Sequence, residues 1–144
     1  MKARMYLRIA SVLTFLHAIL HTIGGVFGKA APGIQETTLA VMKANTFHIL
    51  GVTRSYWDFE RGMGLAVSIF LTIEAVVFWQ LSALAKNDGA RLRPMLGAFV
   101  VTYLAMAVNS YFYFFAAPVI AEIAIAIFLG LAFLAAKPAA VQTS

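Results

Sequence analysis

Residues 94–136 read PMLGAFVVTYLAMAVNSYFYFFAAPVIAEIAIAIFLGLAFLAA and carry one charged side chain, Glu122. A membrane-spanning helix needs about 20 predominantly apolar residues, so this stretch is long enough for two spans. Pro94–Phe115 and Pro118–Ala136 supply them. The turn near Ala116–Pro118 is too short for any connection except an antiparallel hairpin. The stretch therefore predicts two adjacent transmembrane helices.

Two further apolar stretches, Met5–Phe27 and Gly62–Leu84, are also long enough to span a membrane. The first follows a basic start like that of a signal peptide, but its apolar run is long enough for us to expect an uncleaved helix. Only 12% of the 144 residues are charged, against about 25% in soluble domains. We therefore predict an all-α integral membrane protein, a four-helix bundle forming one domain over residues 1–144.

The connection between the first two spans, residues 28–61, is the longest in the chain. Gln35–Leu50 within it mixes apolar and polar positions, which predicts a short helix lying in the membrane interface or folding back as a lid.

The basic residues lie mainly near the ends of the apolar stretches. Seven of them fall at the N-terminus, the turn after Leu84 and the tail, whereas four lie in residues 28–61. The positive-inside rule then predicts cytoplasmic termini and an extracytoplasmic connection. The net charge of +5 therefore indicates contact with lipid headgroups rather than with nucleic acid. The chain has no cysteine, which excludes thiolate catalysis and cysteine-ligated metals.

Protonatable side chains at membrane depth are expensive and usually functional. His17 and His21 are four residues apart, so they share one helical face. Glu74 is expected at the depth of His17, and the two form a candidate acid–base couple. A purely structural buried pair remains the alternative. A metal would need Glu74 or Glu122 as a further ligand, and haem would need one histidine; we predict neither.

The third span carries polar side chains at helical spacing. Thr102, Asn109 and Tyr113 recur at intervals that keep one face, which predicts a polar seam toward the bundle interior. Glu122 is expected at the outer level as a second acid, unless it simply reaches the surface. An apolar cavity with a few polar groups is typical of a small-molecule site.

The start of the second span carries Arg54, Asp58 and Arg61 at helical spacing, which predicts a salt-bridged cluster. Trp57 and Asp58 complete the expected substrate-binding set, with His21, Thr102, Asn109 and Tyr113. The stretch RSYWDFERGMGL, residues 54–65, and the end of its apolar run at WQL resemble a segment of small uncharacterised bacterial inner-membrane proteins. The resemblance covers residues 47–81 and implies a bacterial cytoplasmic membrane.

The predicted architecture also resembles the EXPERA group, four-helix membrane proteins that include sterol isomerases and sterol-binding proteins. The likeness implies buried acids that move a proton beside a double bond or hold an amine. It assigns no residue, because no motif matches.

The leading hypothesis is a membrane enzyme, of isomerase, cyclase or hydrolase type, acting on an apolar small molecule. Its catalytic residues are His17, Glu74 and Glu122. One alternative is a lipid- or haem-binding protein without catalysis. Another is a proton-coupled transporter or channel subunit, for which glycines near Gly24 would supply a homo-oligomer contact.

Overall fold

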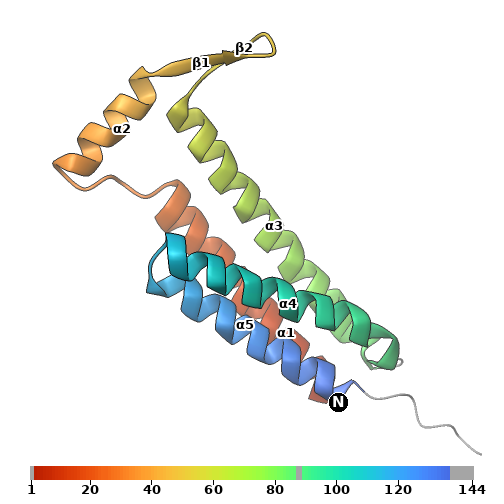
Figure 1. The fold of residues 1–144 in the computed structure, drawn as a ribbon. Helices are drawn as coiled ribbons and strands as arrows, with labels where there is room; N and C mark the ends of the chain where they lie inside the picture. Colours follow the sequence, from red (N-terminus) through yellow and green to blue (C-terminus); the bar gives the residue numbers. More distant parts are fainter. Residues whose placement is uncertain (1, 87–88, 137–144) are drawn as a thin grey trace, which may run out of the picture. The chain divides into compact units, whose positions relative to one another are not determined.

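A computed structural model describes residues 2–86 and 89–136 of the chain, and helices dominate them (Figure 1). The elements in chain order are α1 (Lys2–Leu20), the π-helix η1 (His21–Val26), α2 (Ile34–Ala44), the strands β1 (Thr46–Ile49) and β2 (Val52–Ser55), α3 (Tyr56–Leu84), α4 (Gly89–Tyr113) and α5 (Ala116–Ala135).

Four helices are long and apolar enough to cross a membrane: Lys2–Val26, Tyr56–Leu84, Gly89–Tyr113 and Ala116–Ala135. The four predicted spans are thus confirmed as helices, but their starts were placed too late. The sequence predicts Pro94 as the first residue of its helix, whereas α4 begins five residues earlier and contains Pro94. Pro118 lies in the first turn of α5, where its missing N–H removes no helical hydrogen bond.

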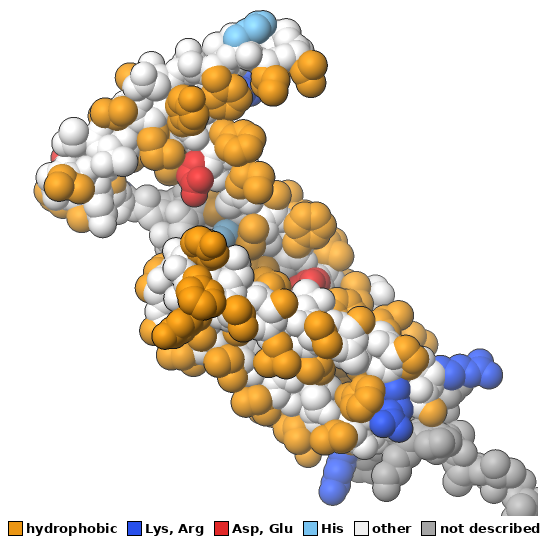
Figure 2. All heavy atoms as spheres, viewed as in Figure 1, with side chains coloured by type: hydrophobic (Ala, Val, Ile, Leu, Met, Phe, Trp, Pro, Cys, Tyr) orange, Lys and Arg blue, Asp and Glu red, His pale blue; other side chains and the backbone are white. Residues whose placement is uncertain are grey.

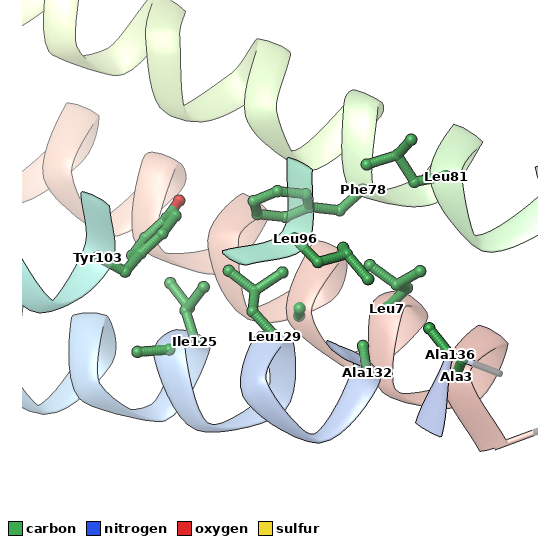
Figure 3. Packing of buried hydrophobic residues seen from close by; sticks show 12 residues of the cluster. Ala3, Leu7, Phe78, Leu81, Leu96, Tyr103, Ile125, Leu129, Ala132 and Ala136 are labelled. Carbon is green, nitrogen blue, oxygen red and sulfur yellow. The ribbon is translucent and has the colours of Figure 1, made fainter. Parts of the chain in front are cut away.

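The chain divides into two compact units. One holds residues 1–17 and 71–144, and we call it the bundle unit; the other, residues 18–70, is the hairpin unit. In the bundle unit, parts of α1 and α3 pack with α4 and α5 around one apolar core (Figure 3). Its fully buried side chains include Leu7, Phe78, Leu96, Tyr103, Ile125 and Leu129.

Each helix of the bundle unit buries a narrow stripe. On α5 the buried residues are Glu122, Ile125, Ala126, Leu129 and Ala132. The steps of three and four from Glu122 through Ile125 and Leu129 to Ala132 are those of supercoiled helix packing. Many stripe positions are alanine or serine, which let helix backbones approach closely inside a membrane.

Apolar side chains also cover the face of the bundle unit seen in Figure 2, as expected for helices that face lipid. Val101, Leu104 and Val108 of α4 are each about half exposed or more, as are Ile127 and Leu134 of α5. Lysine and arginine gather at one end of this unit in Figure 2. Within the bundle unit, Arg8 lies over the Trp79 ring and Arg93 over the Phe133 ring, at 4.8 and 4.5 Å from the centroids.

The hairpin unit corrects the prediction of a helix over Gln35–Leu50. Helix α2 ends at Ala44, and β1 then pairs antiparallel with β2, Thr46 opposite Ser55 and Ile49 opposite Val52. Leu50 and Gly51 form the two-residue turn with φ of 50° and 81°, the signs that a tight hairpin requires. The run after Asn45 is rich in β-branched and aromatic residues, which favour a strand.

The salt-bridged cluster predicted at the start of α3 is also wrong. Asp58 Oδ2 accepts hydrogen bonds from the Ser55 N–H at 3.0 Å and the Ser55 hydroxyl at 2.8 Å, while Ser55 Oγ accepts the Asp58 N–H at 3.0 Å. This reciprocal pairing is a capping box. Among the described residues Asp58 forms no ion pair within 4 Å, and Arg54 instead donates to the Thr53 carbonyl.

Candidate functional site

The core of the bundle unit contains a tyrosine–carboxylate pair. The Tyr103 hydroxyl of α4 donates to Glu74 Oε2 of α3 at 2.7 Å and lies 3.4 Å from Thr14 Oγ1 of α1. Tyr103 and Thr14 are fully buried, whereas Glu74 is half-buried. Three helices thus meet at one phenol, and the short O–H···O contact is typical of a charged acceptor.

A second carboxyl, Glu122 of α5, is bonded to Ser110, which lies two turns after Tyr103 on the buried stripe of α4. Ser110 Oγ donates to Glu122 Oε1 of α5 at 3.0 Å, and Glu122 is 3% exposed. Its Oε2 atom is buried and has no hydrogen-bond partner within residues 2–86 and 89–136. Both carboxylates are near enough to Tyr103 to act on it electrostatically. Glu122 therefore faces the core and does not reach the surface.

Helix α1 adds the remaining polar groups of this core. His17 is 9% exposed and lies one turn from Thr14 on the buried stripe of α1. One turn before Thr14, the Ser11 hydroxyl donates to the Ala75 carbonyl of α3 at 2.6 Å. That bond fixes α1 against the residue next to Glu74. His17, Glu74 and Glu122, the three predicted catalytic residues, all belong to the bundle unit, but the hydrogen bond that defines Glu74 comes from Tyr103.

The predicted polar seam on the third span does not face the core. Thr102, Asn109 and Tyr113 are exposed, and the Thr102 hydroxyl is satisfied by the Ala98 carbonyl of its own helix. The buried stripe is Tyr103, Ala107 and Ser110, one residue further along. One residue turns the face by about 100°, so the expected substrate contacts from this seam are not made in the bundle interior.

The other expected binding residues lie in the hairpin unit. His21 opens η1, and its Nδ1 lies 3.1 Å from Ser68 Oγ of α3; Thr22 Oγ1 donates to the same oxygen at 2.8 Å. A π-helix is rare and recurs at functional sites. Trp57 is half-buried beside a hollow described below, and Asp58 is the exposed cap residue of α3.

A three-ligand metal site is not formed by the described part of the chain, which contains no suitable group of three His, Cys, Asp or Glu side chains. The polar core instead has the donors and acceptors for moving a proton: two carboxyls, an imidazole, a phenol and three hydroxyls. Tyr103 and Ser110 were missed in the sequence. The signal that could have found them is their spacing of seven residues, which is one heptad, or about two helical turns, on one face.

Comparison of the chain with protein-family models, curated proteins and solved structures finds no match. The chemistry of the bundle core therefore supplies the evidence on function.

Proposed function

We propose that the chain is an integral membrane enzyme that performs acid–base chemistry on an apolar small molecule, as an isomerase, cyclase or hydrolase. The observation that carries the proposal is the 2.7 Å hydrogen bond from Tyr103 to Glu74 inside the apolar core. A carboxyl positioned in this way can accept a proton and return it. Because Glu74 is only half-buried, a lipid-soluble molecule can reach it from the bilayer.

Each polar side chain of the bundle core has its own role in the proposed reaction. Glu74 transfers the proton, and the Tyr103 hydroxyl holds the carboxylate in place. His17, one turn beyond Thr14, is the second proton carrier. Glu122, wholly inside the core with its Oε2 atom unpaired, is the second acid. The architectural likeness to the EXPERA group agrees with this proposal.

The proposal includes a topology. The cluster of Lys and Arg at one end of the bundle unit supports cytoplasmic termini through the positive-inside rule. The connection between the first two spans, residues 28–61, then lies on the outer side of a bacterial cytoplasmic membrane.

A deuterium assay tests the enzyme proposal. The purified protein, reconstituted in lipid nanodiscs, is incubated in D₂O with an apolar extract of bacterial membranes, and mass spectrometry follows new products and deuterium on carbon. We expect product with the wild type and about 10²- to 10⁴-fold slower formation with Glu74→Gln, because the amide cannot carry the proton. Glu60→Gln makes the same change at an exposed position of α3 and should behave as the wild type. Equal rates for wild type and Glu74→Gln would contradict the proposal.

A proton-coupled transporter is the second candidate, and the Glu122 pair favours it. Tyr103–Glu74 and Ser110–Glu122 are seven residues apart along α4, about 10 Å, as in a proton relay. Proteoliposomes with an internal pH dye distinguish the two candidates. A relay predicts proton uptake that Glu122→Gln abolishes, whereas the enzyme proposal predicts no uptake with either protein.

A further inference from the structure

The hairpin unit contains an open hollow of about 420 Å³. Three parts of the chain form it: the end of η1 with the segment after it, one face of α2, and the first two turns of α3. Its lining residues are Val26, Phe27, Gly28, Lys29, Ala30, Glu36, Leu39, Lys43, Trp57 and Arg61. We call it the basic hollow.

The charges of the basic hollow are not balanced. Lys29, Lys43 and Arg61 face one carboxylate, Glu36, which leaves a net charge of +2. None of these four groups forms an ion pair within 4 Å in the described residues. The Asp58 carboxylate accepts its hydrogen bonds from Ser55 but lies near enough to act electrostatically on Arg61. With Asp58 counted, the net charge is still +1. An anion is therefore the missing partner.

Aromatic rings hold two of the cations. The Arg61 guanidinium carbon lies 4.8 Å from the Phe27 ring centroid, and Lys43 Nζ lies 5.8 Å from that of Trp57. A cation–π contact orients the side chain without using its N–H groups. Arg61 can thus still present its fork of donors to a planar or tetrahedral anion.

The lining of the hollow and its position at the ends of two candidate spans indicate which kind of molecule supplies the anionic group. Val26, Phe27, Leu39 and Trp57 make part of its lining apolar. The first candidate span ends at Val26 and the second begins at Tyr56, so residues at the ends of both spans line the hollow. The ends of membrane spans lie at the headgroup level of a bilayer, where tryptophan and basic residues concentrate.

We propose that the basic hollow binds the phosphate of an anionic phospholipid headgroup. Arg61, Lys43 and Lys29 contact the phosphate, while Trp57 and Phe27 pack against the start of the acyl chains. The same phosphate chemistry occurs in soluble phosphate esters, so the test separates the two sources. The proposal does not depend on the acid–base site of the bundle unit.

The test measures binding of three probes to the full-length protein in detergent by native mass spectrometry. The probes are phosphatidylglycerol, phosphatidylcholine with the same acyl chains, and inorganic phosphate. We expect preferential binding of phosphatidylglycerol, weakened about fivefold by Arg61→Gln and again by Lys43→Gln, because each basic residue near an anionic lipid contributes by about that factor. Arg54→Gln removes the same charge from β2, outside the hollow, and should change nothing.

Each outcome decides the proposal. Loss in Arg61→Gln and Lys43→Gln, with Arg54→Gln unaffected, supports the lipid site. A different result is that inorganic phosphate competes with the lipid and loses affinity in Arg61→Gln. That result supports the phosphate site, with a soluble phosphate ester rather than a lipid as its ligand. Equal binding of phosphatidylcholine, an equal loss in Arg54→Gln, or no binding of any probe overturns it. Lys43→Gln alters a surface position of α2, so it keeps the test valid if Arg61→Gln does not fold.

Discussion

Replacing Phe78 with alanine is expected to destabilise the bundle unit by about 3 kcal/mol, the low end of the range for a buried phenylalanine. Phe78 is fully buried, and its ring centroid lies 4.9 Å from that of Phe99, edge-on, and 6.1 Å from that of the tilted Tyr103 ring. Lipid tails are as apolar as the core, so most of the transfer term cancels. The lost packing contacts and the cavity then account for the effect.

Unfolding by sodium dodecyl sulfate in mixed micelles measures this change. Phe70→Ala is the matched control, because Phe70 lies on the same helix and is 69% exposed. Its replacement should cost less than about 0.5 kcal/mol. Equal losses at the two positions would mean that Phe78 is not a core residue.

The four spans could be predicted from the sequence because bilayer thickness sets a length that composition alone reveals. The Ala116–Pro118 turn is too short to leave another arrangement of α4 and α5, and the structure has them as neighbouring helices. Helix starts were less accurate. Tyr56 begins α3 six residues before the predicted Gly62, because the capping box at Ser55 and Asp58 lies ahead of the apolar run.

The buried face of α4 could not be predicted in the same way. In a soluble helix the polar face marks the solvent, but in this chain lipid-facing and core-facing positions are both apolar. Asn109 and Ser110 are adjacent polar residues on different faces, and only the second is buried. The prediction that Asn109 faces the core is therefore wrong, and Tyr103 was not identified because it lies on the neighbouring face of α4.

The β-hairpin was missed for a different reason. Hairpin turns are commonly recognised by Asn-Gly or Asp-Gly, whereas this turn is Leu50-Gly51, and Leu50 adopts a positive φ that its side chain disfavours. An apolar residue such as Leu50 is read from sequence as part of the buried face of a helix. In the structure Leu50 is 96% exposed.

Glu74→Gln and Tyr103→Phe are each expected to lower the rate of the proposed reaction about 10²- to 10⁴-fold, the contribution of general acid–base catalysis. The double variant should be no slower than either single variant. Groups that act as one unit show such non-additive losses, and the 2.7 Å hydrogen bond makes Glu74 and Tyr103 one unit. The deuterium assay in nanodiscs supplies the rates.

Stability must be measured beside the rates, because Tyr103→Phe also removes a hydrogen bond to a carboxylate, worth about 1.5–3 kcal/mol. Tyr111→Phe removes the same hydroxyl from an α4 residue that is 73% exposed, so it should leave both the rate and the stability unchanged. Additive rate losses would assign separate roles to the two groups. A wild-type rate in folded Tyr103→Phe would remove Tyr103 from the mechanism, because a phenol that only packs in the core can lose its oxygen without affecting proton transfer at Glu74.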